Sequence, residues 1–177
     1  MQKLKLLGII ESLQMHTREV FKLSKKYVPH FRGVYPLDKL PKSLVVPSNI
    51  IINTHTHNLP GEHWLAVSYQ KSGLVYAFDS FGLYYPTLLQ NYLQKTRRSV
   101  KYNRIQFQEV HEDTCGHYCI AYLIYINTWD CGFQSCQNGY GYFHRFWSIS
   151  ARQWRFHDQR AMHTWWKCTV ETTHVCL

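Results

Sequence analysis

Short apolar runs separated by polar or glycine-containing links fill the middle of the chain. The run SNIIIN at 48–53 is short and continuous, which is typical of a buried strand. The runs HWLAVSY (63–69) and LVYAFD (74–79) are joined by QKSG, and this pattern predicts a β-hairpin. Apolar and polar residues alternate across VKYNRIQFQEV (100–110), which predicts one more strand.

Helical spacing occurs in three other places. It is patchy over 4–23, and it is clearer over 86–96, where Pro86 suits a first turn and leucines recur at turn spacing. The segment CGHYCIAYLIYINTW (115–129) predicts an apolar helix, whereas the segment 25–41, punctuated by Pro29, Gly33, Pro36 and Pro41, predicts turns and short extended pieces. Together these elements predict an α+β fold, with helices flanking a central, mostly antiparallel sheet.

Length and composition favour one folded domain over 1–130 in a chain of 177 residues. The remainder, 131–177, is rich in Cys, Trp and His without a clear period, and we expect an atypical, poorly packed tail. No apolar run reaches the roughly 18 residues that a membrane helix needs, and LLGII near the start is too short for a secretory signal. We therefore expect an intracellular protein without membrane contact, and a monomer.

The net charge of +9 is distributed unevenly along the sequence. Residues 1–42 hold nine Lys or Arg against three acids, and 95–104 adds five more without an acid. Such a basic surface either is simply solvated or contacts nucleic acid. The candidate DNA-contacting residues are Lys95, Arg97, Arg98, Lys101 and Arg104.

All six cysteines lie at or after Cys115, and in an unsecreted chain they indicate thiols rather than a disulfide framework. Cys115 begins the predicted apolar helix, with Asp113 or Thr114 available as its cap. Unpaired N–H groups and the helix dipole at such a position favour a thiolate. Cys119 lies one turn further on the same face, and we expect it to pack beneath Cys115.

A nucleophilic cysteine requires a histidine, a group that orients the histidine, and donors for the oxyanion. His63 opens one strand of the predicted hairpin and Asp79 ends the other, so the hairpin would bring them together. Gln108, seven residues before Cys115, could supply an oxyanion donor together with the Cys115 amide. Gln106 would share its strand face, but the spacing favours Gln108.

The segments INTHTHNLPGEHWLAVSY, VYAFDSFG and FQEVHEDTCGHYC together resemble the adenain-like cysteine proteases, which include the adenovirus endoprotease and relatives in large DNA transposons. SUMO-type ubiquitin-like-protein proteases are more distant members of this group. The order His63, Asp79, Gln108, Cys115 follows the family pattern, and the resemblance covers roughly residues 31–129.

This resemblance implies the adenain-like fold and peptide-bond hydrolysis at sites with small residues, in viral or transposon capsid precursors. It also implies a location in the host nucleus or virion. No cofactor or metal is implied, although DNA and a short peptide are candidate activators by resemblance alone. Rival hypotheses are a processing protease for a ubiquitin-like protein and a decayed, DNA-binding virion component.

The same residue types also serve as metal ligands in proteins. His55, His57, His63, Cys115 and Cys119 lack a compact pair of chelating motifs, which disfavours zinc. The tail offers further ligand types in spacings of no known finger: Cys131, Cys136, His144, Cys168, His174 and Cys176. We take His117 as a surface or structural residue, and Trp64 as packing beside His63 or under the cleft.

Overall fold

The apolar runs form the centre of a five-stranded sheet in the computed structural model, which describes residues 15–128. The predicted tail at 131–177 and the first part of the predicted helix at 4–23 lie outside the described residues. Residues Ser12–Asn127 form one compact unit. In chain order its elements are α2 (Thr17–Tyr27), β1 (Phe31–Pro36), the 3₁₀ turn η1 (Leu37–Lys39), β2 (Ser48–Asn53), β3 (Trp64–Tyr69), β4 (Val75–Asp79), α3 (Thr87–Lys95), β5 (Val100–Tyr102) and α4 (Cys115–Thr128).

The strands lie in the order β1-β2-β3-β4-β5. The two central pairings, β2 with β3 and β3 with β4, are antiparallel, so the predicted hairpin is confirmed. Both edge pairings, β1 with β2 and β4 with β5, are parallel. The α+β class is therefore confirmed, but the prediction of a mostly antiparallel sheet is correct only for the three central strands.

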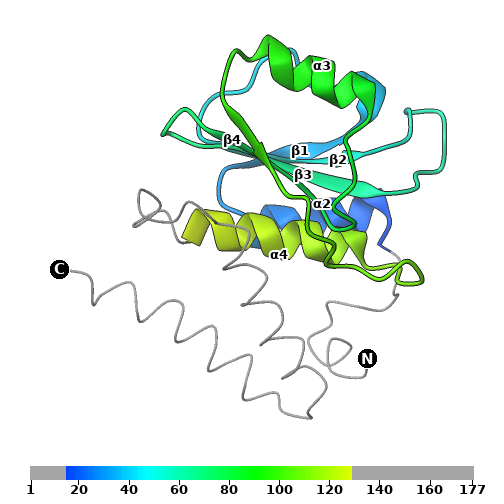
Figure 1. Ribbon diagram of the computed structural model, residues 1–177. Helices are drawn as coiled ribbons and strands as arrows, with labels where there is room; N and C mark the ends of the chain where they lie inside the picture. Colours follow the sequence, from blue (N-terminus) through cyan, green and yellow to red (C-terminus); the bar gives the residue numbers. More distant parts are fainter. Residues whose placement is uncertain (1–14, 129–177) are drawn as a thin grey trace. The chain divides into compact units, whose positions relative to one another are not determined.

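This topology brings many chain connections to one end of the sheet, where strands β1, β2, β4 and β5 terminate. Asn53 at the end of β2 pairs with Trp64 at the start of β3, and Asp79 at the end of β4 lies opposite Leu65. Because β1 is parallel to β2 and β5 is parallel to β4, these two strands also terminate at this end of the sheet. The connections after β1, β2, β4 and β5 therefore all leave from the same end, which Figure 1 shows on the right of the sheet.

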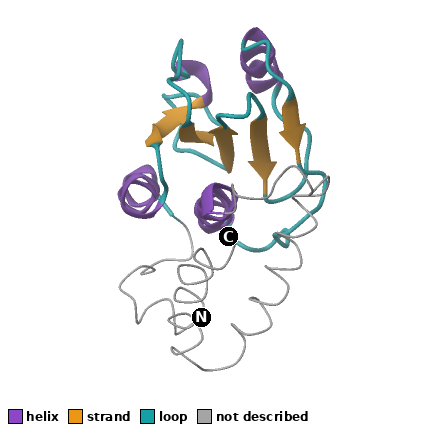
Figure 2. Ribbon diagram, turned by 90° about the vertical axis from the view of Figure 1, so that its left-hand side faces the viewer, coloured by secondary structure: helices purple, strands orange, loops and turns teal. Residues whose placement is uncertain are grey.

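Helices cover both faces of the sheet. α3 lies on one face and α2 and α4 lie on the other, as both views show (Figures 1 and 2). On the α4 side the rings of Phe78 and Tyr122 stack at a centroid distance of 4.3 Å. All residues of β2, β3 and β4 are consequently buried. The core on the α3 side consists of Leu37, Ile50, Ile52, Leu65, Val67, Tyr69, Val75, Ala77, Tyr85, Leu89 and Leu93.

Two predictions of local structure were wrong in part. The segment 25–41 was expected to hold turns and short extended pieces; β1 and η1 bear this out, but α2 continues to Tyr27. Lysines in the last turn of α2 suit the helix dipole, and the helix stops just before Pro29. The strand expected over 100–110 is confined to β5.

β5 is short because the side chain of Asn103 takes the place of the next backbone hydrogen bonds between β4 and β5. Asn103 accepts a hydrogen bond from the backbone N–H of Asp79 and donates one to its carbonyl. These are the two groups that a longer β5 would have paired. The chain after Asn103 is therefore free to leave the sheet as a loop that leads to α4.

Candidate active site

The β3–β4 hairpin places His63 against Asp79. His63 directly precedes β3, and Asp79 is the last residue of β4. The distance between His63 Nε2 and Asp79 Oδ1 is 2.7 Å. The two side chains are largely enclosed, with 14% and 4% of their surface exposed. The prediction that the hairpin brings these two residues together is confirmed.

The turn after β4 fixes the Asp79 carboxylate. Its Oδ1 also accepts a hydrogen bond from the backbone N–H of Phe81, at 2.9 Å. The Phe81 ring packs on the His63 imidazole with 4.8 Å between centroids. Gly82 closes the turn at φ +67°, and a Cβ there would lie 2.8 Å from the carbonyl carbon of Ile105. Glycine is therefore required by both the backbone angle and the close approach of the 103–108 loop.

Cys115 is the third member of this group. It is partly exposed at the first position of α4, and its side chain lies within hydrogen-bonding reach of the His63 ring. Asp79 occupies Nε2, so the ring nitrogen that remains for Cys115 is Nδ1. Burial lowers the pKa of His63, but the hydrogen bonds and charges of Asp79 and Cys115 outweigh burial and raise it to about 9.

Gln108 lies in the loop before α4 and not in the predicted strand. It is buried, and its backbone N–H donates to the carbonyl of Ser80. Its side chain accepts from the Ser80 hydroxyl at 2.7 Å and donates to the carbonyl of Glu112. Gln106, the alternative candidate, is exposed and donates to the Gln108 carbonyl. The structure thus joins Gln108 to the residue next to Asp79.

Two residues of this arrangement were missed in the sequence. Ser80 and Asn103 are both fully or almost fully buried, and both connect the end of β4 to the loop that carries Gln108. A small hydroxyl residue directly after the acid that ends a strand was the available signal for Ser80. Nothing in the spacing identified Asn103, because its partners lie 24 residues away in the chain.

The first turn of α4 packs closely beneath the site. A Cβ at Gly116 would lie 3.3 Å from side-chain atoms of both Met15 and Trp64, and Trp64 donates its indole N–H to the Met15 carbonyl. The thiol of Cys119 is fully buried and donates to the Trp64 carbonyl at 3.2 Å. Burial raises its pKa well above the usual value. Cys119 is therefore buried one turn after Cys115, as predicted, and Trp64 packs against Met15 and the first turn of α4.

The start of α4 differs from the prediction in its cap. The Thr114 carbonyl accepts hydrogen bonds from the N–H groups of His117 and Tyr118, so Thr114 is the capping position. Its hydroxyl, however, is buried and has no hydrogen-bond partner among the described residues. The first turn therefore has no side-chain cap from Thr114.

His117 is half-buried, and its ring is enclosed. Both ring nitrogens are buried and have no hydrogen-bond partner within the described part of the chain. Burial lowers its pKa to about 4, and the charge of Glu19 opposes this shift only partly. A neutral, enclosed imidazole has a structural role, which was one of the two roles expected for it.

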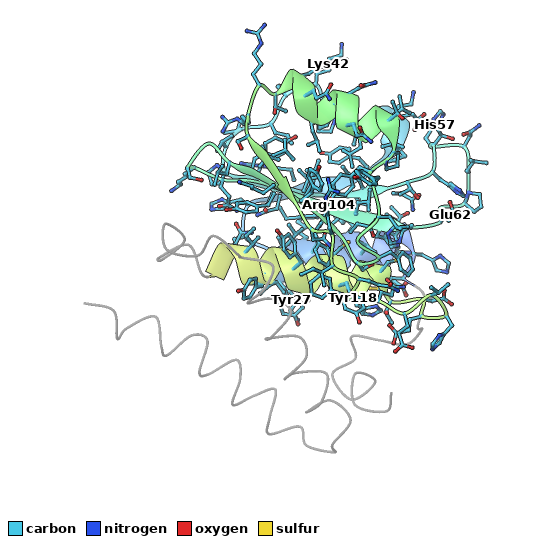
Figure 3. The ribbon with its side chains drawn as sticks, in the orientation of Figure 1. Tyr27, Lys42, His57, Glu62, Arg104 and Tyr118 are labelled. Carbon is cyan, nitrogen blue, oxygen red and sulfur yellow. The ribbon has the colours of Figure 1, made fainter. Side chains whose placement is uncertain are left out.

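The histidines of the β2–β3 loop pair with carboxylates. His57 Nδ1 lies 2.6 Å from Asp38 Oδ2, and His55 Nε2 lies 2.9 Å from Glu62 Oε2. Figure 3 shows His57 and Glu62 on this loop. Within residues 15–128, no group of three or more His, Cys, Asp or Glu side chains is placed to hold a metal ion.

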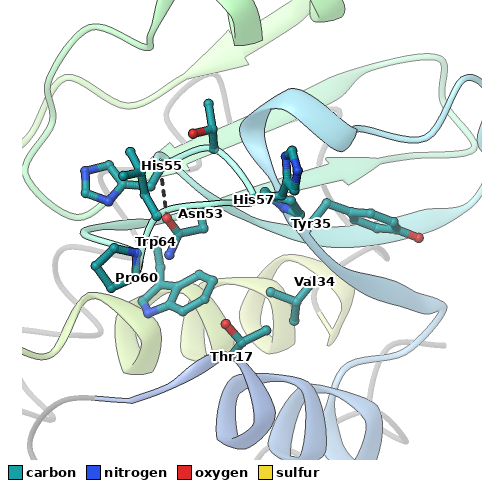
Figure 4. Close-up of a pocket in the computed structure, with 12 residues that line it drawn as sticks. Thr17, Val34, Tyr35, Asn53, His55, His57, Pro60 and Trp64 are labelled. Carbon is teal, nitrogen blue, oxygen red and sulfur yellow. Dashed lines mark hydrogen bonds between the residues drawn. The ribbon is translucent and has the colours of Figure 1, made fainter.

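A pocket of about 200 Å³ lies beside Trp64, the neighbour of His63 in the chain. Its walls come from the start of α2, the end of β1 and the β2–β3 loop, as Figure 4 shows. Asn53 forms part of the floor and accepts a hydrogen bond from the His55 backbone N–H. The lining includes Thr17, Val34, Tyr35, His57, Pro60 and Gly61.

The basic stretch, residues 95–104, runs from the last turn of α3 through β5 to the loop that follows it. Lys95, Arg97 and Lys101 are exposed. Arg104 is held between two tyrosines, with its guanidinium 4.7 Å from the Tyr84 ring centroid and 5.1 Å from that of Tyr102. The stretch is therefore a surface feature of this unit, of which Arg104 already has aromatic partners.

None of the helices in the described region is both long enough and apolar enough to span a bilayer. In comparisons with known proteins, no protein-family model matches the chain and no curated protein matches its sequence.

Proposed function

We propose that this chain is a cysteine endopeptidase in which Cys115 is the nucleophile and His63 its proton carrier. The observation that carries the proposal is a single imidazole bound to a buried carboxylate on one side and within reach of a thiol on the other. The thiol begins a helix whose N–H groups and dipole stabilise negative charge. This combination is the one that thiol-dependent acyl transfer requires.

The raised pKa of His63 favours an ion pair in the resting enzyme. With a pKa of about 9, the imidazole is protonated at neutral pH and stabilises a thiolate at Cys115. Asp79 holds the ring through Nε2, so that Nδ1 faces the reacting sulfur. The thiolate attacks the scissile carbonyl, His63 protonates the leaving amine, and water then releases the acyl group with His63 as the base.

Negative charge develops on the carbonyl oxygen during this attack. The backbone N–H of Cys115 and the carboxamide of Gln108 are the proposed donors to this oxyanion. Gln108 Nε2 carries two hydrogens, and the Glu112 carbonyl takes one of them. The second hydrogen is the one proposed to bind the oxyanion.

The order His63, Asp79, Gln108, Cys115 supports the adenain-like assignment in particular. By this resemblance the substrates are capsid precursors cut beside small residues, and the fold is the adenain-like one. The pocket beside Trp64 offers space for one side chain of an extended peptide. A processing protease for ubiquitin-like proteins would use the same four residues, so only substrate assays distinguish the two.

The decisive experiment is alkylation by iodoacetamide at pH 7, followed by peptide mass mapping of each cysteine. We expect Cys115 to react faster than any other cysteine, because only a thiolate attacks the reagent. The variant His63→Ala should slow the alkylation of Cys115 by at least tenfold. Cys115→Ala should abolish cleavage of Gly-containing peptides without unfolding the chain.

Cys119→Ala is the matched control, since it removes a neighbouring thiol on the same helix face. It should leave both the alkylation of Cys115 and peptide cleavage unchanged. Equal alkylation rates for Cys115 in the wild type and in His63→Ala would refute the proposed ion pair. Peptide cleavage by purified Cys115→Ala protein would refute the nucleophile.

A further inference from the structure

The Ser80 hydroxyl determines which way round the Gln108 carboxamide lies. The carbonyl of Glu112 can only accept a hydrogen bond, so the end of the carboxamide that faces it must be the NH₂ group. The opposite end must then be the oxygen. The group that faces this oxygen, 2.7 Å away, is the Ser80 hydroxyl, which therefore donates.

Backbone contacts keep the two residues in register. The Ser80 carbonyl accepts hydrogen bonds from the N–H groups of Phe107 and Gln108, at 2.8 Å and 3.0 Å. Ser80 is fully buried and Gln108 is 1% exposed, so water does not compete for the hydroxyl or for the carboxamide oxygen. Ser80 thus fixes the Gln108 side chain through its hydroxyl and holds the Gln108 backbone through its carbonyl.

Ser80 also lies next to the carboxylate that binds His63. Ser80 directly follows Asp79, whose carboxylate holds His63. The Asp79 backbone is in turn bound by Asn103, which lies at the start of the loop that carries Gln108. One turn of chain, 79–82, therefore positions both the acid and the carboxamide.

We propose that Ser80 is a positioning residue for catalysis, which acts through Gln108 by holding its NH₂ group towards the oxyanion. This inference rests on the proposed peptidase function. Without the hydroxyl, the carboxamide oxygen loses its donor, and the side chain gains rotamers in which the oxygen faces the developing negative charge. Such rotamers lower the rate of acyl transfer and leave the Cys115–His63 pair intact.

The test compares two reactions of the same thiol. Hydrolysis of a fluorogenic coumarin amide of a Leu-Gly-Gly peptide passes through an oxyanion, whereas alkylation by iodoacetamide is a displacement at carbon that forms none. Ser80→Ala should lower kcat about tenfold or more, with KM and the alkylation rate unchanged. Ser48→Ala is the matched control, because Ser48 is equally buried and its hydroxyl has no partner among the described residues. It should keep the wild-type kcat.

A double-mutant cycle shows whether Ser80 acts through Gln108. In a Gln108→Ala background, Ser80→Ala should cause no further loss of kcat. Full additivity, an unchanged kcat in Ser80→Ala alone, or a parallel fall in alkylation would each overturn the inference.

Failure of the proposed function gives a different result. If the wild type hydrolyses no peptide amide, the side-chain NH₂ signals of Gln108 in a ¹⁵N-labelled protein still test the positioning role. They should be two separate, slowly exchanging signals in the wild type, and they should exchange at least tenfold faster in Ser80→Ala. Equal exchange in both proteins would overturn the role of Ser80 without reference to activity.

Discussion

The pairing of His63 with Asp79 makes the stability of the protein depend on pH in a definite direction. The folded-state pKa of His63 is about 9, against 6.5 for a free histidine. Since the folded state holds the proton more tightly, the contribution is complete below pH 6.5 and is lost as the pH rises to about 9. At about 1.4 kcal/mol per pKa unit, the shift corresponds to about 3 kcal/mol of unfolding free energy. Only 14% of the His63 side chain is exposed, so solvent screens the pair little.

The perturbation that isolates this effect is Asp79→Asn, which keeps the shape of the side chain and removes its charge. Urea unfolding of both proteins should be followed by circular dichroism at pH 6, 7, 8, 9 and 10. The advantage of the wild type over Asp79→Asn should shrink by most of about 3 kcal/mol between pH 6.5 and 9. In the variant the Asp79 charge no longer raises the pKa of His63, while burial still lowers this pKa and Cys115 still raises it, so the stability of the variant should fall much less over this window. A constant difference between the two proteins across this range would refute the reasoning.

Four further predictions follow from individual contacts. Gly82→Ala should lower the free energy of unfolding in urea by about 2 kcal/mol or more, because the new Cβ would meet the Ile105 backbone. Gly73 also has a positive φ (+88°) but has no atom near the position of a Cβ, so Gly73→Ala should lower it by only about 1 kcal/mol. Equal losses in the two variants would contradict the close approach at Gly82. Cys119→Ala should lower stability by about 1–2 kcal/mol in the same assay and leave peptide cleavage intact; loss of cleavage would indicate a catalytic thiol. Val34→Trp should raise KM by filling the pocket without slowing alkylation of Cys115, and an unchanged KM would place the substrate elsewhere. Replacing Arg97 and Lys101 by Gln should weaken duplex DNA binding and reduce the salt slope by about two, measured by fluorescence anisotropy; unchanged binding would exclude this stretch as a DNA contact.

Local patterns in the sequence predicted the hairpin and, through it, the meeting of His63 and Asp79. Two β runs around a short glycine-containing link leave little freedom in how their outer ends pair. The parallel direction of β1 and β5 could not be read in this way, because an apolar run carries no information about the direction of its neighbour. The end of β5 was equally hidden, since a side chain from Asn103 takes over the pairing of Asp79.

The positions of candidate site residues could be predicted where they depended on residue type and order. Cys115 at a helix start and Gln108 seven residues earlier were both identified from spacing. The bond between Ser80 and Gln108 was not, because it joins residues 28 apart in the chain through a loop whose path no periodicity describes. The choice between the surface and structural roles expected for His117 was open for a similar reason: the burial of its ring depends on the packing around α4, and its position in the helix alone does not reveal this.

His63 and Asp79 lie at one end of the sheet, and the β3–β4 turn lies at the opposite end. There Lys71 and Ser72 are exposed and Gly73 has no atom near its missing Cβ. This turn is therefore the natural place to attach the protein to a surface or to insert an affinity handle. A protein immobilised at this turn would leave the His63–Asp79 pair and the pocket beside Trp64 facing the solution, so a library of free peptides could be screened without a partner first being known.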